Sequence, residues 1–320
     1  MTTEGTTTEG TTTEGIAREG IATDGTRPVL GRAREVELLV AALDGGAHVL
    51  LEGPPGTGKS TLLRSVATDR SAPFHLVEGN AELTPARLVG HFDPAQVMAR
   101  GYDPDVFVDG PLVAALRSGG LLYVEEINRV PEETLNVLIT VMSESELSVP
   151  RLGLVHAEPG FRLVAAMNPF DAVGTERISS AIYDRTCRIS MDYQSAATES
   201  DIVALRADGS GHGDAEWRAK VVDLVRRTRS HPDVRIGSSV RGAIDLVAIA
   251  SRLAVMRSVP AEDWHAGLDA ALVSLSGRIR LHESATHRPE EIVREIYETV
   301  FGPPPDDAAA SPGGSDPGEA

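Results

Sequence analysis

The feature that most constrains the fold is an eight-residue turn, GPPGTGKS at residues 53–60, which fits the pattern G-x-x-x-x-G-K-[ST] at every position. The apolar run AHVLLEG precedes it, and a stretch with helical period follows it. Small residues between a buried strand and a helix let backbone N–H groups turn inward at the helix N-terminus, where the partial positive charge favours an anion. The turn therefore predicts an α/β fold with a loop that holds phosphate groups.

Two side chains of this loop carry chemistry that a plain turn does not need. Lys59 is placed to reach the β- and γ-phosphates of a bound nucleotide, and the Ser60 hydroxyl is placed to ligate Mg²⁺. A strand-to-helix turn without a ligand would explain the glycines but neither of these residues. We therefore expect ATP and Mg²⁺ as cofactors. The predicted nucleotide-binding residues are Gly53, Pro54, Pro55, Gly56, Thr57, Gly58, Lys59, Ser60 and Thr61.

A pair of glutamates follows a second apolar run, in LLYVEEINR at residues 121–129. In proteins with a phosphate-binding loop, an acid at the end of a second strand holds Mg²⁺, and another group orients the attacking water. We assign the metal to Glu125, together with Ser60, and the water to Glu126. Without the loop upstream, the two glutamates would favour a merely solvated acidic pair. Because Asp is common in the first position, the longer Glu125 could displace the metal's water by about an ångström, which can cost roughly a hundredfold in rate.

Five short apolar runs alternate with stretches of helical period, which predicts a parallel sheet covered on both faces. These runs are AHVLLEG, FHLVEG, GLLYVEEI, FRLVAAMNP and CRISMDY. After Tyr193 the strand patterns stop and four helical stretches follow. We therefore expect an α/β core at residues 27–197 and a helical domain at residues 198–301. Two segments, residues 81–110 and 145–161, interrupt the alternation as insertions, and the second has the pattern of a hairpin.

The two ends of the chain have a different composition. Residues 1–25 are five pentapeptides, MTTEG, TTTEG, TTTEG, IAREG and IATDG, which offer almost nothing to bury. The far end is poor in large apolar residues and rich in Pro, Gly and Asp. We expect disordered tails at residues 1–26 and 302–320.

Composition also lowers the expectation for several classes of function. Asp and Glu number 47 against 30 Lys and Arg, and the net charge of −17 opposes nonspecific binding to nucleic acid or to an anionic membrane. We find no apolar run of about eighteen residues and no basic-then-apolar N-terminus, so we expect a cytoplasmic protein without membrane insertion. The single cysteine, Cys187, fits a reducing compartment, and we interpret it as a buried structural thiol rather than a nucleophile.

Five motifs together resemble the AAA+ ATPases, and within them the MoxR group, which is related to magnesium chelatase ATPase subunits. The motifs are GPPGTGKST, GPLVAALRSGGLLYVEEINRVPEETLNVLITVMSE, VAAMNPFDAVGT, AIYDRTCRI and IGSSVRGAIDL, and the resemblance covers roughly residues 27–255. It implies a P-loop NTPase core of AAA+ type with a small C-terminal helical lid domain. It also implies an ATP hydrolase whose sites lie between the subunits of a ring, for which we expect a hexamer.

The resemblance adds two residues from the chain's own site. Asn168, at the end of FRLVAAMN, resembles the sensor-1 residue that holds the lytic water together with Glu126. An Asn that simply caps a strand end before Pro169 is the alternative. Arg241, in SSVRG, resembles the sensor-2 arginine at the start of a lid helix, with an ordinary surface arginine as the alternative.

A third residue would come from a neighbouring subunit. Arg185, in YDRTCR, resembles the arginine finger that contacts the γ-phosphate across a subunit boundary. Family members usually carry Phe after this arginine, whereas this chain has Thr186. Arg188 therefore competes for the role, and we favour Arg185.

The two insertions match in position the helix-2 insert and the hairpin insert of the MoxR and chelatase groups, where remodelling ATPases touch their clients. The resemblance thus implies chaperone-like remodelling of an unknown client protein, with a von Willebrand A domain protein as partner. The alternatives are an ATPase of the metal-chelatase type, one that activates Rubisco or nitric oxide reductase, and a gas-vesicle ATPase. A nucleotide-gated scaffold with little turnover is an alternative from another class, and action on DNA is disfavoured by the net acidity.

Overall fold

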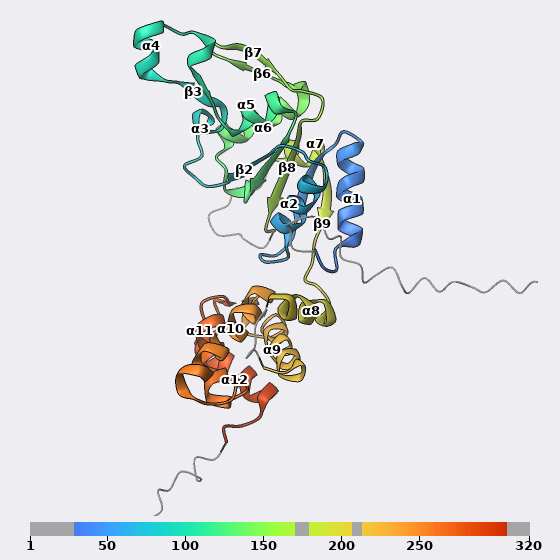
Figure 1. Cartoon of the computed structure of the whole chain (residues 1–320), viewed down its shortest axis with the longest axis vertical. Coiled ribbons are helices and arrows are strands. Elements are labelled where there is room, and N and C mark those ends of the chain that lie inside the picture. Colours follow the sequence, from blue (N-terminus) through green and yellow to red (C-terminus); the bar gives the residue numbers. More distant parts are fainter. Residues whose placement is uncertain (1–28, 170–178, 207–212, 306–320) are drawn as a thin grey trace, which may run out of the picture. The chain divides into compact units, whose positions relative to one another are not determined.

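The computed structural model of the chain describes residues 29–169, 179–206 and 213–305 (Figure 1). The expected tail at residues 1–26, most of the one at 302–320, and the part of VAAMNPFDAVGT after Pro169 lie outside these residues. The chain divides into two compact units between Tyr193 and Gln194. Each unit has its own apolar core.

The first unit is built on a parallel five-stranded sheet in the order β2-β5-β8-β1-β9. Its strands are β1 His48–Glu52, β2 Phe74–Glu78, β5 Leu121–Glu125, β8 Arg162–Met167 and β9 Thr186–Ser190. Each of the five apolar runs in the sequence forms one of these strands, so the predicted P-loop NTPase fold with a parallel sheet is confirmed. Because all five strands run the same way, their carboxyl ends meet at one edge of the sheet.

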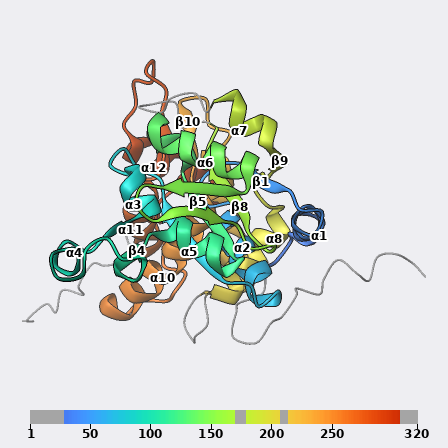
Figure 2. The same cartoon turned by 90° about the horizontal axis from the view of Figure 1, so that it is seen from above.

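Helices cover both faces of this sheet. On one face, α1 (Ala33–Asp44) and α2 (Lys59–Asp69) share a cluster with the strand residues Val49, Tyr123 and Val164. Figure 2 shows α1 nearly end-on beside the strands that it contacts, β1 and β9. On the other face, α5 (Pro111–Ser118), α6 (Glu132–Glu144) and α7 (Ser180–Arg185) contribute to the cluster around Leu50, Leu122 and Leu163. Neighbouring strand residues point to opposite faces, which explains this division.

The two insertions form one end of the first unit (Figure 1). The first contains α3 (Pro85–Val89), α4 (Pro94–Arg100), a 3₁₀ turn at Pro104–Val106 and the antiparallel pair β3 (Gly90–Phe92) and β4 (Phe107–Asp109). The second is an antiparallel hairpin of β6 (Glu146–Val149) and β7 (Gly153–His156). The Arg151 guanidinium at the hairpin turn lies 3.8 Å from the centre of the Tyr102 ring, so a cation–π contact joins the two insertions.

The second unit is mainly helical, as expected. Its helices are α8 (Ala196–Arg206), α9 (Ala215–Thr228), α10 (Val240–Arg257), α11 (Trp264–Leu275) and α12 (Pro289–Phe301). The expectation that strands stop after Tyr193 is wrong, because β10 (Val234–Ile236) and β11 (Arg280–Leu281) pair antiparallel. Strands of three and two residues are too short for the alternation by which a strand is recognised in a sequence.

The interpretation of Cys187 as a buried thiol is also wrong, because its side chain is exposed. Cys187 lies in β9, the edge strand of the sheet, two residues before the buried Ile189 on the same strand face. The helices that bury Ile189 on this face therefore leave Cys187 open to solvent. Among the described residues, each helix is too short or too polar to cross a lipid bilayer.

Candidate functional site

The glycine-rich loop lies between the end of β1 and the start of α2, at the edge where the strands end. Gly58, the N-cap residue of α2, has φ of 89°, which is strained for residues with a side chain, and Gly56 has φ of 75°. A Cβ on Gly53 would lie 2.0 Å from the Met191 carbonyl oxygen, so only glycine fits there. Because the N-cap residue has no side chain, the first N–H groups of α2 are left for an anion.

The Lys59 side chain folds back over this loop. Its Nζ donates to the carbonyl oxygens of Gly53 at 2.8 Å and Pro54 at 2.9 Å. The Thr57 hydroxyl donates to the same Pro54 oxygen at 3.0 Å, which closes the loop. An ammonium group held in this way lies inside the ring of backbone groups, where the phosphates of a nucleotide would enter.

Glu125 ends β5 directly beside the loop. The Ser60 hydroxyl donates to Glu125 Oε1, so the two predicted metal ligands are in contact. The Tyr123 hydroxyl donates to the same oxygen at 3.1 Å, and it lies 3.3 Å from Ser60 Oγ. Sequence reasoning missed Tyr123, because a tyrosine inside an apolar run is read as core. Its ring is indeed fully buried, and burial raises the pKa of its phenol well above the ordinary value.

Glu126 follows with a backbone in the left-handed region, φ 48° and ψ 45°. A residue with a side chain adopts this conformation at a cost of about 1 kcal/mol or more, and such residues gather at functional sites. The Glu126 carboxylate pairs with Arg129 at 2.7 Å, and each side chain is 45% exposed. Glu126 is therefore partly exposed to solvent at the strand-end edge, and its role in activating water stays a prediction.

Asn168 directly follows β8, the strand between β1 and β5. The pairing of Glu52 with Met167 and of Val124 with Ala165 places it at the same edge as the phosphate loop and Glu125. Its side chain is half-buried. The structure thus brings together the loop, both glutamates and Asn168 within the first unit.

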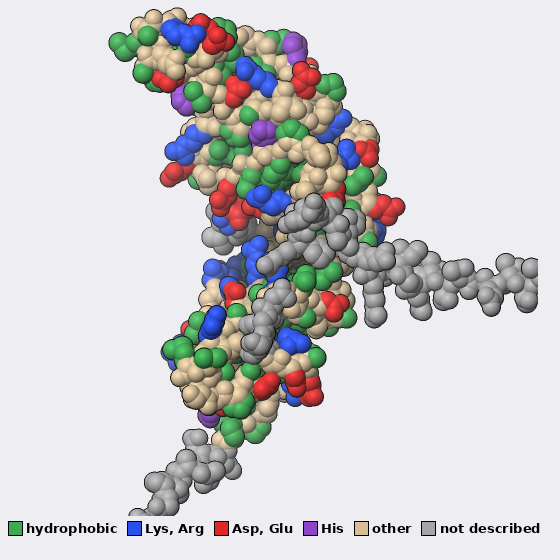
Figure 3. All heavy atoms as spheres, viewed as in Figure 1, with side chains coloured by type: hydrophobic (Ala, Val, Ile, Leu, Met, Phe, Trp, Pro, Cys, Tyr) green, Lys and Arg blue, Asp and Glu red, His purple; other side chains and the backbone are tan. Residues whose placement is uncertain are grey.

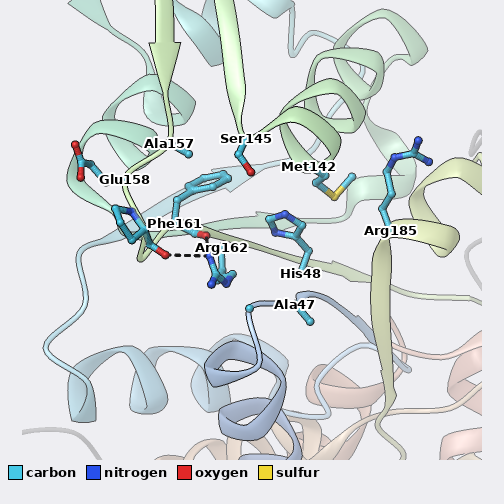
Figure 4. A pocket seen from close by; sticks show the side chains of 11 residues that line it. Ala47, His48, Met142, Ser145, Ala157, Glu158, Phe161, Arg162 and Arg185 are labelled. Carbon is cyan, nitrogen blue, oxygen red and sulfur yellow. Dashed lines mark hydrogen bonds between the residues drawn. The ribbon is translucent and has the colours of Figure 1, made fainter.

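Arg185 lies at the opposite edge of the sheet. It ends α7 just before Thr186, which pairs with His48, the first residue of β1. The five residues of β1, at about 3.3 Å each, separate this edge from the phosphate loop. Arg185 Nε donates to the Ser143 hydroxyl at 2.6 Å, and Figure 4 shows Arg185 beside His48 at a cavity of about 290 Å³. Arg185 is therefore remote from the loop of its own chain.

Arg188, the competing residue, is engaged within the chain. Its Nη1 lies 3.0 Å from Oε2 of Glu52, the last residue of β1. The Glu52 side chain is 13% exposed and that of Arg188 is 60% exposed. Arg188 thus neutralises a half-buried carboxylate next to the loop.

Comparison with known proteins agrees with this geometry. Residues 48–186 match the AAA domain of the dynein-related subfamily. An uncharacterized protein of Staphylococcus saprophyticus is 30% identical over 218 residues, which cover 66% of this chain and 81% of that protein. The chain belongs to the AAA+ ATPases.

Two further AAA+ similarities are informative. The gas vesicle ATPase GvpN of Haloferax mediterranei is 31% identical over 212 residues, which cover 61% of this chain and 60% of GvpN. The RuvB Holliday junction branch migration motor of Thermotoga maritima superposes with a TM-score of 0.52 at 19% identity, over 75% of this chain and 67% of RuvB. The second similarity shows the fold alone. The AAA domain and the relationship to gas vesicle ATPases show that this chain is an ATP hydrolase.

Arg241 belongs to the other unit of the AAA+ chain. It is the second residue of α10, its side chain is exposed, and its carbonyl oxygen accepts from Arg278 Nη1 at 3.4 Å. The assignment of Arg241 as the sensor-2 arginine stays a prediction.

Sequence reasoning also missed Arg32, which precedes α1 and is only 4% exposed. Its Nη2 donates to the carbonyl oxygen of Thr57 in the phosphate loop, at 3.0 Å, and to that of Asp192, just before the second unit begins. Its Nη1 pairs with Glu35 at 2.6 Å. One buried guanidinium thus connects the loop to the end of the AAA+ core. Thr57 and Asp192 lie 25 and 160 positions after Arg32 in the sequence, so no local pattern reveals these contacts.

His48, at the opposite edge, is held neutral. Burial and then the positive charge of Arg162 lower its pKa to about 4. The unprotonated Nδ1 accepts a hydrogen bond from Leu163 N at 2.9 Å, which fixes the start of β1 to β8. His48 is therefore a structural residue.

Proposed function

We propose that this protein is a MoxR-like AAA+ ATPase that couples hydrolysis of Mg-ATP in a ring, most simply a hexamer, to remodelling of a client protein. The observation that carries the proposal is the division of the charged groups between two edges of one sheet. Lys59 and both glutamates lie at the strand-end edge, whereas Arg185 lies at the opposite edge. AAA+ ATPases commonly assemble as rings, and in a ring the second edge of one subunit can face the first edge of its neighbour.

In this proposal each residue at the strand-end edge has one role. Lys59 leaves the Gly53 and Pro54 oxygens and binds the β- and γ-phosphates, which the N–H groups of the loop also hold. Glu126 accepts a proton from the attacking water, which Asn168 helps to orient. Arg241 of the lid is the proposed sensor-2 arginine.

The oxygen donors of the site suit Mg²⁺. Mg²⁺ in nucleotide sites is usually bound by one or two protein oxygens together with substrate phosphates and water. The Ser60 hydroxyl and the Glu125 carboxylate supply such oxygens side by side. Within the described residues no group of three His, Cys, Asp or Glu side chains could hold a metal by itself, so the phosphates would complete the site. When bound, Mg²⁺ would neutralise charge on the phosphates.

Arg185 is the proposed arginine finger, because it is remote from its own loop and donates to neutral groups, the Ser143 hydroxyl and the Ala181 carbonyl oxygen. Arg188 is less suited to the role. Withdrawing it would leave the Glu52 carboxylate, 13% exposed, without this cation.

The insertions are the proposed contact with the client. Figure 3 shows hydrophobic side chains on the surface of this end of the first unit. Met98 is 92% exposed, and Tyr102, Val108 and Leu154 are 49%, 47% and 51% exposed. The proposed partner is a von Willebrand A domain protein. A gas-vesicle role is the second candidate, supported by the identity to GvpN over 61% of this chain.

The test uses Glu126→Gln, which should bind ATP without hydrolysing it and hold the ring in its ATP state. Affinity capture with this variant and ATP should enrich a von Willebrand A domain protein and a client, and Lys59→Ala, which cannot bind ATP, is the matched control. Sedimentation should show an ATP-dependent ring. A monomer at all ATP concentrations, or equal capture by both variants, would contradict the proposal.

A further inference from the structure

Three polar groups meet where β5 ends against α2, and one of them comes from the buried core. Ser60 Oγ and Tyr123 OH both donate to Glu125 Oε1, the second at 3.1 Å, and the two hydroxyls lie 3.3 Å apart. Residues 123 and 125 lie on the same face of the strand because side chains alternate along it. The phenol therefore reaches the carboxylate from inside the protein.

The position of this phenol is fixed by its ring. Tyr123 has no exposed surface and packs in the cluster that includes Leu62 and Leu63 of α2. Its ring centre lies 6.1 Å from that of Phe74 on β2. A phenylalanine or leucine would fill such a core site, whereas a buried hydroxyl costs free energy unless it is hydrogen-bonded. The Tyr123 hydroxyl meets this requirement by donating to Glu125.

The hydrogen bond from Tyr123 restrains the Glu125 side chain, which is longer than that of aspartate. Glutamate has one more methylene than the common aspartate, so its carboxylate has one more torsion to fix and reaches farther from the backbone. A hydrogen bond from a rigid donor to a charged acceptor removes that freedom. Ser60 can also turn its oxygen toward a cation without leaving Glu125 unpartnered, because Tyr123 still donates to it.

We propose that Tyr123 is a positioning residue, whose phenol holds the Glu125 carboxylate beside Ser60 and so sets where this longer acid holds the cation of the bound nucleotide. The inference rests on the proposed metal role of Ser60 and Glu125. It also predicts that tyrosine at position 123 and glutamate at position 125 act as a pair.

The test measures cation affinity rather than turnover. Paramagnetic Mn²⁺ replaces Mg²⁺, and free Mn²⁺ is quantified by its electron paramagnetic resonance signal in the presence of saturating ADP. Tyr123→Phe should weaken Mn²⁺ binding about tenfold, as is usual when the partner of a metal ligand is lost. ADP affinity in EDTA should stay within about twofold, because the phosphate loop keeps its contacts. Tyr297→Phe is the matched control, since it removes a buried phenol that donates to Trp264 O in the second unit, and it should not change Mn²⁺ affinity.

A double-mutant cycle with Glu125→Asp isolates the pair. The aspartate is shorter by one carbon–carbon bond, about 1.5 Å, and takes the carboxylate out of reach of the phenol. Tyr123→Phe should therefore cost less than about twofold in the Glu125→Asp background. A tenfold loss in both backgrounds, or none in the wild-type background, would overturn the inference.

Glu125→Gln separates this inference from the proposed site. Weakened Mn²⁺ binding in Glu125→Gln but unchanged binding in Tyr123→Phe would refute the role of Tyr123 alone. Unchanged Mn²⁺ binding in Glu125→Gln would refute the metal role of Glu125 itself, and with it the inference.

Discussion

Replacing Gly79 with alanine should push the end of β5, which carries Glu125, away from the end of β2. Gly79 follows β2, and its N–H donates to the Glu125 carbonyl oxygen at 2.8 Å. A Cβ built on Gly79 would lie 2.5 Å from the Glu126 carbonyl oxygen and 2.6 Å from that of Glu125. Ordinary contacts of a Cβ begin at 3.4 Å, so the closer oxygen must move from 2.5 to 3.4 Å, by about 0.9 Å. Both obstacles are backbone atoms, which no side-chain rotation can relieve.

This shift falls on Glu125 and Glu126, the two residues whose carboxylates are proposed to hold the metal and to activate water. A displacement of about 1 Å can lower the rate roughly a hundredfold, so kcat for ATP hydrolysis in Gly79→Ala should fall by about one to two powers of ten. Overpacking and the strained hydrogen bond should lower the free energy of unfolding by about 1–3 kcal/mol. ADP affinity measured in EDTA should change little, because the phosphate loop follows β1 rather than β2.

The assays are steady-state ATP hydrolysis and thermal unfolding on the same preparations. Gly277→Ala is the control, because a Cβ there would meet no atom within 4 Å, and the variant should match the wild type within about 0.5 kcal/mol. A folded Gly79→Ala protein with wild-type kcat would refute the reasoning that the crowding of Gly79 positions the glutamates.

Two other predictions concern stability. Because the folded-state pKa of His48 is lowered to about 4 from 6.5, its neutral ring stabilises the fold fully above pH 6.5, and this contribution is lost as the pH falls toward 4. Relative to His48→Asn, the wild-type free energy of unfolding in urea should fall by about 1 kcal/mol between about pH 7.5 and about pH 5.5, and parallel pH curves would contradict this. Arg32→Ala removes the buried donor to Thr57 O and should lower the free energy of unfolding by about 2–3 kcal/mol. The control Arg34→Ala, at an exposed position, should lower it by less than about 0.5 kcal/mol. Equal melting temperatures of the two variants would contradict a stabilising role for the Arg32 contacts.

The parts of the fold that the sequence predicts are those with a local pattern. Each sheet strand is a short apolar run between helical stretches, and the phosphate loop follows a motif whose glycines meet backbone constraints, a positive φ at Gly58 and the Met191 oxygen beside Gly53. The location of Glu125 beside Ser60 follows from the same logic, because parallel strands end at one edge.

The features that the sequence does not reveal depend on residues far apart in the chain. Arg32 contacts Asp192 across 160 residues, and β10 pairs with β11 across more than forty. The hydroxyl of Tyr123 lies in a run that reads as core, and its partner is recognised only when the strand is built. Cys187 is exposed because its strand is at the edge of the sheet, and strand order cannot be read from the runs themselves.

The most direct test of the shared site mixes two inactive proteins. Glu126→Gln loses the group proposed to activate water, and Arg185→Ala loses the proposed finger, so each should hydrolyse ATP poorly alone. In mixed rings some interfaces would pair an intact Glu126 with an intact Arg185 from the neighbour, and ATPase activity should partly return. The same mixture made with Arg188→Ala tests the competing arginine. Activity that stays at the level of the separate proteins with either arginine variant, in mixtures shown to exchange subunits, would contradict a site shared between neighbours.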